Sequence, residues 1–559
     1  MTVLATAGHV DHGKSTLVNF LTGQETDRLK EEKQRGLTIN LGYTYFDYED
    51  KRFSIVDVPG HSDYFKNTIS GFSNVDGVLF CIDSTQGWSQ QSEEHFLSLL
   101  NLGINNLIFF LTKIDKKETV FRKNDLINKL IDFKEIHYEL IEFSSINSNK
   151  DAVQKNIYDF FSQCKVNLNP PSLWVDRAFS IEGIGKVITG TASKNMSFDK
   201  VFVNDQKTQL DIREVESVGQ KMSSLISSSS RIAISLKNNK SDPKKGSLLT
   251  NQLLKEKTYL FIRPNTDTSL FSERGTLRIY IGTHTQTIKK IKNIKIDNKI
   301  LALVQLEKSI PVLDFQKVLV HNLSKNTFSG GSIFHSTNNS YLIKKIMRDI
   351  RIKDNIIPKD IFTLIPKNLL SSNSEDYKRI ENFYIITKKL ETLEEKIKTN
   401  IIEINKSGVR SYFYKNFYID EKYLDKLAVY FKSIRIQNDQ IIENKITDID
   451  SRLLEEIKSQ LGKTLNVSSV DLKKYDTEAI KSLFMNGSLY RVSKNIVISE
   501  DQKNQLIEII DSLPENFSVA NFKEKSSLTR KYAIPFLEFL DKELITKKID
   551  SSGLRKKIN

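Results

Sequence analysis

Residues 8–15 read Gly-His-Val-Asp-His-Gly-Lys-Ser, a complete GxxxxGK[ST] pattern. A short apolar run at residues 2–7 precedes them, and a helix-like stretch at residues 17–21 follows. A strand, a glycine loop and a helix in this order form a phosphate-binding loop, because backbone N–H groups and the positive end of the helix dipole face one anion. We expect Lys14 to reach the outer phosphates and the Ser15 hydroxyl to ligate Mg²⁺. The residues predicted to bind the phosphates are Gly8, His9, Val10, Asp11, His12, Gly13, Lys14, Ser15 and Thr16.

Two later segments supply what a nucleotide-dependent switch needs. Thr38 lies in Lys-Gln-Arg-Gly-Leu-Thr-Ile, where a mobile segment can place its hydroxyl on the same metal ion. Asp57 ends a second apolar strand in the pattern Asp-x-x-Gly. Asp57 can hold Mg²⁺ through a water, while the N–H of Gly60 can contact the terminal phosphate and so sense its loss. The predicted metal ligands are therefore Ser15, Thr38 and, through water, Asp57.

The ends of two further strands indicate which base is bound. An apolar run at residues 107–111 precedes Thr112, Lys113 and, two positions later, Asp115. A carboxylate there accepts from both guanine N1–H and the 2-amino group, a donor pair that adenine lacks. Ser144 and Ser145 close another strand and could offer a backbone N–H to the guanine oxygen. Five motifs in this order predict GTP and GDP as the ligands, with Mg²⁺.

His61 directly follows the Asp-x-x-Gly turn, where the attacking water must lie. A histidine at this position can orient that water, and the arrangement resembles translational GTPases. We therefore predict His61 as the catalytic residue. Residues 83–87 (Asp-Ser-Thr-Gln-Gly) and 91–95 (Gln-Ser-Glu-Glu-His) are also similar to a stretch that these factors share.

One segment separates subfamilies within that superfamily. Residues 31–36 contain the Glu-Glu-Lys-x-Arg-Gly core of general tRNA-delivery factors, but the flanking Asp-Arg-Leu at 27–29 and Leu-Gly-Tyr at 41–43 resemble the bacterial selenocysteine-specific elongation factors. Residues 176–179 and 183–191 resemble the start of that family's second domain. The resemblance covers most of residues 1–340 and returns near the C-terminus. The chain departs from the family at Thr112, where Asn is usual, and at Ser145, where Ala is usual, yet Asp115 and a backbone N–H remain.

Composition limits the class of protein. A chain of 559 residues is too long for one core, so we expect several domains. The net charge of +14 suits a polyanionic partner, although a lysine-rich solvated surface has the same composition. Only two cysteines, Cys81 and Cys164, are present, so we expect neither a disulfide framework nor a zinc site. No apolar run approaches the ~18 residues of a membrane span and no cleavable leader is visible, which predicts a cytoplasmic protein without a membrane partner.

The pattern along the chain predicts a multidomain fold: an α/β P-loop GTPase domain, two antiparallel β-barrels, and then α+β winged-helix modules. Strands alternate with helices to about residue 165, and short alternating segments with Gly turns follow. Beyond about residue 340 polar helices dominate, including one expected at 387–404. The predicted domains are the GTPase at 1–170, barrels at 171–253 and 254–340, a helical or winged-helix-like region at 341–450, and winged helices at 451–500 and 501–559.

The tail predicts an RNA-binding module. Apolar stripes at helical spacing run through residues 501–513 and 530–543, and a hairpin is expected around 551–553. Helices followed by a basic hairpin form a winged helix. Pro535 conflicts with a regular helix, so we expect a later helix start or a kink. Residues 521–559 hold ten Lys or Arg against five Asp or Glu. The predicted RNA contacts are Arg530, Lys531, Arg555 and Lys556.

The family resemblance implies a function for the whole chain. It implies a monomer that carries selenocysteyl-tRNA to the ribosome at UGA codons while its last winged helix grips an mRNA hairpin. It also points to Asp176, Arg177 and Arg231 as the aminoacyl pocket. Because a selenol is ionised at neutral pH, guanidinium groups there could discriminate it from a serine hydroxyl by charge. For Arg177 and Arg231, ordinary salt bridges at the barrel edge remain an alternative.

Two other functions stay open at this point. The chain could be another tRNA-carrying translational GTPase with an RNA-binding tail, of the general or the initiator-tRNA type. It could also be an RNA-binding scaffold whose nucleotide site no longer turns over. The presence of Lys14, Ser15, Thr38, Asp57 and His61 favours hydrolysis over the scaffold.

Overall fold

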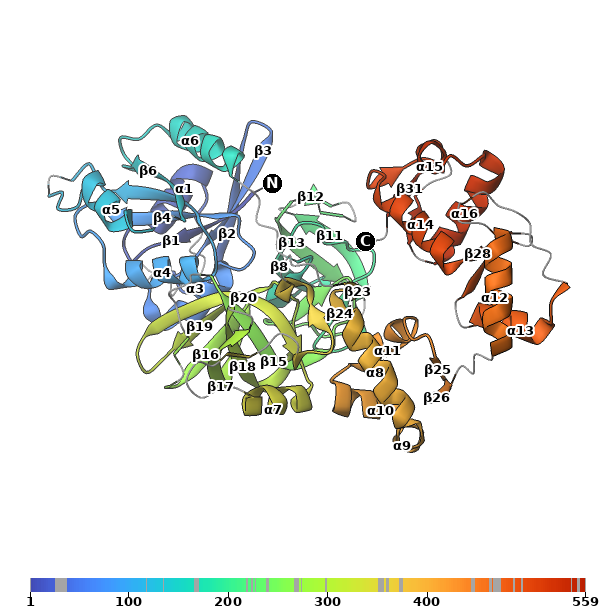
Figure 1. Cartoon of the computed structure of the whole chain (residues 1–559). Coiled ribbons are helices and arrows are strands. Elements are labelled where there is room, and N and C mark those ends of the chain that lie inside the picture. Colours follow the sequence, from blue (N-terminus) through green and yellow to red (C-terminus); the bar gives the residue numbers. More distant parts are fainter. Residues whose placement is uncertain are drawn as a thin grey trace. The chain divides into compact units, whose positions relative to one another are not determined.

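The chain folds into two compact units, residues 1–361 and 362–559, in the computed structural model (Figure 1). Each unit has hydrophobic clusters of its own. The structure describes residues 2–25, 38–116, 118–133, 135–164, 170–217, 220–222, 225–226, 228–237, 241–265, 271–272, 274–296, 299–349, 356–357, 361–370, 376–443, 448–461, 465, 474–485, 488–493, 496–543, 545–549 and 553–557. The segment 26–37, which carries part of the family resemblance, and residues 470–472 of the predicted fifth domain lie outside the described residues.

The first unit begins with a six-stranded sheet in the order β2-β3-β1-β4-β5-β6. All neighbouring strands are parallel except the antiparallel edge pair β2 and β3. The strands are β1 (Thr2–Ala7), β2 (Gly42–Tyr48), β3 (Lys51–Asp57), β4 (Gly77–Asp83), β5 (Asn106–Thr112) and β6 (His137–Glu142). The helices are α1 (Lys14–Thr22), α3 (Phe65–Gly71), α4 (Gln90–Asn101), α5 (Lys123–Leu130) and α6 (Lys150–Gln163). This is the predicted α/β GTPase fold.

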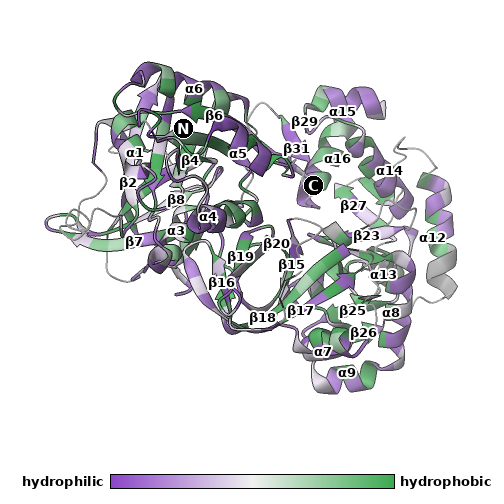
Figure 2. Cartoon of the chain, turned by 90° about the vertical axis from the view of Figure 1, so that its left-hand side faces the viewer, coloured by the Kyte–Doolittle hydropathy of each residue, from purple (hydrophilic) through white to green (hydrophobic). Residues whose placement is uncertain are grey.

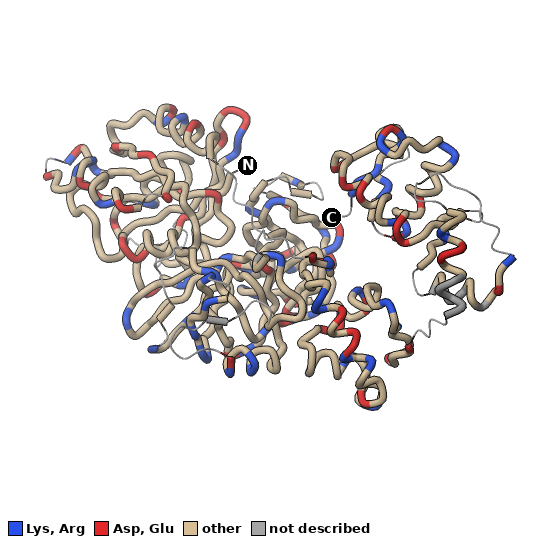
Figure 3. Tube along the Cα trace, viewed as in Figure 1, with Lys and Arg blue, Asp and Glu red and all other residues tan. Residues whose placement is uncertain are grey.

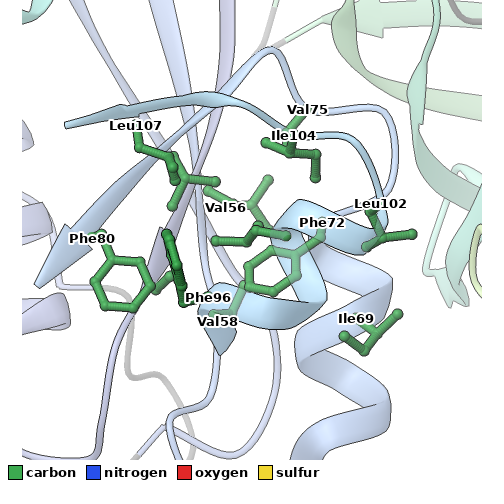
Figure 4. Packing of buried hydrophobic residues seen from close by; sticks show 14 of the residues in the cluster. Val56, Val58, Ile69, Phe72, Val75, Phe80, Phe96, Leu102, Ile104 and Leu107 are labelled. Atoms are coloured by element: carbon green, nitrogen blue, oxygen red, sulfur yellow. The ribbon is translucent and has the colours of Figure 1, made fainter. Parts of the chain in front are cut away.

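Alternating residues of the central strands bury both faces of this sheet. Val3 and Ala5 of β1 pack with α3, α4 and α5, whereas Leu4 packs with α1 and α6 on the other face. Figure 4 shows the first face, where Phe72, just after α3, and Phe96 of α4 lie against β-strand residues such as Val56 and Phe80. Hydrophobic residues dominate the central strands, and the covering helices mix hydrophobic and polar residues (Figure 2). Because both faces are covered, the loops at the strand ends are left to carry the chemistry.

Two antiparallel β domains follow the GTPase. The first is an eight-stranded sheet made of β7 (Leu173–Ile181), β8 (Gly185–Ala192), β9 (Phe202–Val203), β10 (Thr208–Gln209), β11 (Ile212–Ser217), β12 (Gln220–Lys221), β13 (Ser230–Leu236) and β14 (Leu248–Thr250). The second contains β15 (Glu256–Pro264), β16 (Leu277–Ile281), β17 (His284–Ile296), β18 (Lys299–Pro311), β19 (Lys317–Asn322), β20 (Thr327–Thr337) and the short β21 (Ile356–Ile357). The pairing of β16 with β17 closes the second sheet into a barrel.

The predicted boundary at 253/254 falls between β14 and β15, and the one at 340/341 falls at the start of α7 (Ser340–Asp349). The hydrophobic cores cross these boundaries. Tyr280 and Leu319 of the second β domain join the GTPase core, and Trp174 and Leu248 of the first join the core of the second. The two β domains and the GTPase are thus packed against one another through buried apolar surface.

The second unit starts with a short meander of β22 (Ile365–Pro366), β23 (Tyr377–Ile380) and β24 (Phe383–Ile386). Helices α8 (Thr387–Thr399), α9 (Ile401–Ser407), α10 (Val409–Tyr412) and α11 (Glu421–Ala428) follow, and a hairpin of β25 (Ile434–Gln437) and β26 (Gln440–Glu443) ends this module. The helix expected at 387–404 is interrupted, because the backbone N–H and side-chain amide of Asn400 donate to the last carbonyls of α8. This region is therefore helical with a terminal hairpin.

Asn405 of α9 replaces a strand partner for β26. Its Nδ2 donates to the carbonyl of Ile441 over 3.1 Å, and its Oδ1 accepts from the N–H of Ile441 over 2.7 Å. A two-stranded hairpin leaves one edge of backbone groups without partners, and such groups are costly when water is excluded. One side chain thus closes the edge of β26.

Two further modules complete the unit. The first contains α12 (Asp448–Leu461), α13 (Thr477–Met485) and the hairpin of β27 (Leu489–Ser493) and β28 (Ile496–Ser499). The second contains α14 (Glu500–Asp511), β29 (Asn516–Phe517), α15 (Val519–Ser526), α16 (Arg530–Lys542) and the strands β30 (Thr546–Lys548) and β31 (Arg555–Lys557). Their cores merge, since Val492 and Ile498 pack with Leu506 and Phe536. Lys503 of α14 also lies 4.1 Å from the ring centroid of Tyr490.

Pro535 lies inside α16, which begins at Arg530, so of the two expected outcomes, a later helix start or a kink, the later start is not seen. The N–H groups of Tyr532 and Ala533 both donate to Thr529 and close the first turn before the proline. Buried Phe536 and Leu537 then hold the following turns against the core. Packing of the apolar face therefore outweighs the hydrogen bond that Pro535 cannot make.

We expect Asn405→Ala to loosen the β25–β26 hairpin while leaving the fold intact. The amide of Ile441 loses its acceptor, which costs about 1–3 kcal/mol for a buried group, so its hydrogen exchange should accelerate by about tenfold or more. The measurement is site-resolved hydrogen exchange of the whole chain. Asn416→Ala is the matched control, because that amide donates only to the exposed carbonyl of Tyr412. Equal exchange at Ile441 in both variants would contradict this role of Asn405.

Candidate functional site

The predicted phosphate loop joins β1 to α1 with the backbone that the motif requires. Gly8 has φ 123° and Gly13 has φ 85°. A Cβ on Gly8 would overlap the carbonyl oxygen of Cys81 in β4, so only glycine fits there. Lys14 is 6 % exposed, and its Nζ donates to the carbonyl of His9 over 2.7 Å. The loop is therefore folded back over its own lysine at the start of α1.

Histidines occupy the interior of this loop. The rings of His9 and His12 meet edge to face with centroids 5.0 Å apart. Burial, helped by the charges of His9 and Lys14, lowers the pKa of His12 to about 4. His95 of α4 is also buried, and its Nδ1 accepts the N–H of Gly8 over 3.1 Å. Burial lowers the pKa of His95 to about 3, so it is a neutral acceptor at neutral pH.

The three predicted metal ligands meet at one point. The Ser15 hydroxyl donates to Asp57 Oδ2 over 2.8 Å and lies 3.0 Å from the Thr38 hydroxyl. Asp57 is fully buried, and its Oδ1 accepts from Thr6 over 2.8 Å. Two hydroxyls and a carboxylate are the hard oxygen donors that Mg²⁺ prefers, so these residues fit that ion. Among the residues described, no group of three or more His, Cys, Asp and Glu side chains could hold a metal ion, so this oxygen cluster is our candidate.

Gly60 and His61 lie in the loop between β3 and η1. A Cβ on Gly60 would lie 2.8 Å from the backbone nitrogen of Val10 and would also press on Lys14 Nζ, so Gly60 packs directly on the phosphate loop. His61 precedes the short helix η1 (Ser62–Tyr64) and is half exposed. Its Nδ1 accepts the N–H of Asp63 over 3.2 Å. The same Nδ1 lies 3.4 Å from Asp63 Oδ2, so Nε2 is the nitrogen that remains for a water.

The predicted guanine site lies at the ends of β5 and β6. Thr112, where the family has Asn, donates its hydroxyl to the carbonyl of His12 over 2.9 Å, so it ties β5 to the phosphate loop. Lys113 has φ 59° and its Nζ pairs with Asp83 Oδ2 at 2.7 Å. Although burial alone would raise the pKa of Asp83, bonds from Lys113 and Thr85 lower it. The side chain of Asp115 is exposed two residues later, where a base can reach it.

Ser144 and Ser145 follow β6, the parallel neighbour of β5. The Ser144 hydroxyl is buried and accepts the N–H groups of Ile146 and Asn147, each over 3.2 Å. It therefore shapes the turn, and Ser145 stands exposed at its outer side.

The predicted aminoacyl-pocket residues lie where the first β domain meets the GTPase. Asp176 and Arg231 form a buried bidentate ion pair, with Arg231 Nη2 2.7 Å from Asp176 Oδ1. The guanidinium of Arg231 stacks on Tyr43 of β2, 3.7 Å from its ring centroid. Arg177 lies over the same ring at 4.8 Å and donates to the carbonyl of Leu41. The alternative of an ordinary salt bridge thus describes Arg231, whereas the exposed Arg177 is not paired to Asp176 by any ion pair among the described contacts.

Basic side chains from both β domains lie within electrostatic reach of Lys66 in the GTPase. Lys245 of the first β domain donates to Asn67 of the GTPase over 2.8 Å. Burial lowers the pKa of Lys245, and the positive charges of Lys66 and Arg177 lower it further. Burial and Lys66 also lower the pKa of His284 in the second β domain. We call Lys66, Arg177, Lys245 and His284 the junction cluster.

In the second unit, Arg530 and Lys531 are exposed at the start of α16 and Lys556 is exposed in β31. Arg555 differs from them, because its guanidinium is buried and pairs with Asp541 Oδ2 at 3.0 Å. Lys557, which was not predicted, donates to the carbonyl of Asp511 over 2.9 Å. Arg530, Lys531 and Lys556 are therefore exposed, whereas Arg555 is buried inside the module.

Sequence reasoning missed Tyr43, Lys245 and the role of His95. Tyr43 belongs to a segment with family likeness. An aromatic residue on an edge strand, however, gives no sign that two arginines contact its ring. Lys245 is one of many lysines. His95 stands in a stretch that resembles other translational GTPases, but its acceptor role depends on a contact 87 residues away in the chain.

Comparisons with known proteins agree with this geometry. Residues 1–209 match the family described as elongation factor Tu GTP binding domain, and residues 508–551 match the elongation factor SelB winged helix. The chain is 35 % identical over 199 residues to the selenocysteine-specific elongation factor of Escherichia coli, and 34 % identical over 199 residues to that of Desulfomicrobium baculatum. These alignments cover 34 % of this chain and 32 % and 31 % of the relatives, so the matched part spans about a third of their length.

Solved structures extend the likeness. The crystal structure of a bacterial selenocysteine-specific elongation factor, EF-Sec, aligns over 100 % of this chain and 99 % of its own, with 26 % identity and a TM-score of 0.60. Elongation factor SelB of Methanococcus maripaludis shares the fold over 60 % of this chain and 79 % of its own, with 21 % identity and a TM-score of 0.50. The chain is therefore similar to the selenocysteine-specific elongation factors: residues 1–209 match an elongation factor Tu GTP binding domain, and residues 508–551 match a SelB winged helix.

Proposed function

We propose that this protein is a GTP-dependent elongation factor that delivers selenocysteyl-tRNA to the ribosome at UGA codons, tethered to an mRNA hairpin by its last winged helix. The observation that carries the proposal is the likeness to EF-Sec over both whole chains, because a GTPase with two β domains alone would not separate this factor from other translational GTPases. We further propose that it acts as a monomer in the cytoplasm, where ribosomes work. Among the described residues, no helix has the length and apolar character to cross a membrane.

The nucleotide site supports hydrolysis of GTP with Mg²⁺. Ser15 and Thr38 would ligate the ion directly and Asp57 through a water, in keeping with their convergence. Bound Mg²⁺ neutralises charge that develops on the phosphate oxygens. Lys14 and the N–H of Gly60 contact the outer phosphates, so departure of the γ-phosphate removes the partner of Gly60 and releases the loop that follows it.

His61 positions the attacking water in this proposal. The water oxygen bonds to the γ-phosphorus, the bond to the bridging oxygen breaks, and GDP and phosphate form. His61 donates from Nε2 to the water while its Nδ1 is held by the N–H of Asp63. The half-exposed ring is free to be aligned when the ribosome contacts this loop.

The junction cluster is proposed to receive the end of the tRNA. Its positive groups, Lys66, Arg177 and Lys245, come from the GTPase and the first β domain, and the neutral ring of His284 adds a hydrogen-bonding group from the second. Phosphates contribute most of the sequence-independent affinity in nucleic-acid complexes. The nearby Arg177 can then contact the aminoacyl group. Tyr43 contacts both Arg177 and the Arg231 that pairs with Asp176, so this pair helps to position Arg177.

The last winged helix is proposed to grip the mRNA hairpin. Lys and Arg residues are spread over both units, so net charge alone does not mark the site (Figure 3). Arg530 and Lys531 stand at the start of α16, where side chains can reach the splayed bases and phosphates of a hairpin loop. Lys556 flanks them in the wing in this proposal, while Arg555 orders the wing through Asp541.

His61→Ala should leave GTP and GDP affinity unchanged and slow ribosome-stimulated hydrolysis by about 100-fold, the typical contribution of a positioned acid–base side chain. Binding of a fluorescent guanine nucleotide and phosphate release with ribosomes are the two measurements. Asp47→Ala is the control, because Asp47 pairs with Arg52 at the surface of β2 and β3. Unchanged turnover would remove His61 from the mechanism.

The unaltered chain should bind selenocysteyl-tRNA only with GTP, and seryl-tRNA on the same tRNA body far more weakly. Arg177→Ala should reduce this preference by about tenfold, since it removes the guanidinium left for the selenolate. Filter binding of both charged tRNAs measures it. Arg213→Ala is the matched control, because this barrel arginine donates to the carbonyl of Ile184 instead. Equal binding of both tRNAs by the unaltered chain would indicate another tRNA-carrying GTPase.

Arg530→Ala combined with Lys531→Ala should weaken binding of an mRNA hairpin and lower the slope of log affinity against log salt by about 1–2, because each phosphate that is no longer neutralised reduces the slope by about one. GTP hydrolysis should be unchanged. Point variants are preferable to truncation at residue 500, because α14 shares a core with β27 and β28. Lys523→Ala combined with Lys525→Ala makes the same charge change on α15, and an equal loss in both pairs would refute a site at α16.

A further inference from the structure

Helix α4 contacts the phosphate loop through one buried side chain. His95 accepts the N–H of Gly8 through Nδ1 over 3.1 Å. The ring is 2 % exposed and meets Phe72, the residue that follows α3, edge to face at 6.0 Å between ring centroids. At the far end of the loop the N–H of Leu17 donates to Gly13 within the helix α1. The loop is therefore fixed at its end by α1 and at its beginning by α4.

The same helix is fastened to the second β domain at two other points. Asn326 Nδ2 donates to Glu94 Oε1 over 2.8 Å, one residue before His95. At the C-terminal end of α4, Asn265 Nδ2 donates to the carbonyl of Asn101 over 2.5 Å. Helix α4 thus lies between the phosphate loop and the second β domain and is bonded to both.

The contact at the end of α4 is also close packed. A Cβ built on Gly103 would lie 3.0 Å from Lys317 Nζ, so the ammonium group sits beside the end of the helix, where the dipole favours a cation. A Cβ on Gly330 would lie 2.7 Å from the side chain of Asn101 and would overlap its carbonyl, so β20 also lies directly on this end. Separation of the second β domain would remove these contacts from α4 at once.

We propose that His95 is the positioning residue of the phosphate loop, and that α4 makes release of the nucleotide depend on contact with the second β domain. This inference rests on the proposed binding of guanine nucleotide at the loop. A rigid helix held at both ends can shift only as a body, and a shift of α4 pulls His95 away from Gly8. The N–H of Gly8 is then a buried donor without an acceptor, and the beginning of the loop loosens.

Two substitutions of His95 separate the hydrogen bond from the packing. His95→Phe keeps a ring against Phe72 and removes the acceptor, whereas His95→Asn keeps an acceptor one bond from Cγ. We expect His95→Phe to accelerate dissociation of fluorescent GDP by about tenfold or more and His95→Asn to restore it to within about threefold of the unaltered chain. Thermal unfolding of each variant shows whether packing alone changed. A structural role alone would make both variants equally fast.

The far side of α4 tests the dependence on the second β domain. Asn265→Ala combined with Lys317→Ala should also accelerate dissociation by about tenfold, and adding His95→Phe should give less than the product of the two effects. Lys289→Ala, an exposed lysine of β17, is the control. If His95→Phe does not fold, the rate of GDP dissociation from the Asn265→Ala and Lys317→Ala variant still tests the inference.

The outcomes distinguish the inference from the proposed function. If the unaltered chain binds no guanine nucleotide, the proposed function falls. If it binds but every variant releases GDP at the rate of the unaltered chain, the role of His95 and α4 is refuted. Fast release in His95→Phe with normal release in the Asn265 and Lys317 variant would refute the dependence on the second β domain.

Discussion

The buried carboxylate of Asp57 is the interaction on which the first unit depends. It accepts from Thr6 of β1 on one oxygen and from Ser15 of α1 on the other, while Thr6 in turn accepts the N–H of Val58. A buried charge persists only when such bonds compensate its lost hydration. The bonds therefore fix where β1, β3 and α1 stand relative to one another, and this is also the point at which Thr38 arrives. The oxygen atoms that hold these elements together are also those of the proposed metal site.

The domains of the first unit form a connected body around that point. Tyr280 and Leu319 lie in the GTPase core, and Tyr43 of the GTPase lies under arginines of the first β domain. If the junction cluster binds cargo as proposed, that cargo would respond to movement of the loops after β2 and β3. An order–disorder switch needs such continuity, because removal of one phosphate can act at a distance only through packed elements.

Local patterns predicted most of the fold, and the structure brings the residues of the candidate nucleotide site together at the ends of the strands. The glycine loop, the strand runs that end at Asp57 and Thr112, and the apolar stripes of α14 and α16 each carry their signal within a few residues. Contacts over long sequence separations account for what the local patterns did not predict. Helix α16 starts before Pro535, where Phe536 and Leu537 are buried, and Arg555 is buried because it pairs with Asp541 of α16. Asn405 closes the edge of β26 with a side chain that no strand pattern contains.

The merged core of the last two modules has a mechanical consequence. Residues of β27 and β28 pack with α14 and α16, and Lys503 bridges toward Tyr490. Because the two modules share one core, they would move as one stiff body if the last winged helix holds a message as proposed. In that proposed function, bending between the message and the rest of the chain would have to occur upstream of the paired modules, and lengthening the chain near residue 500 would add flexibility between them.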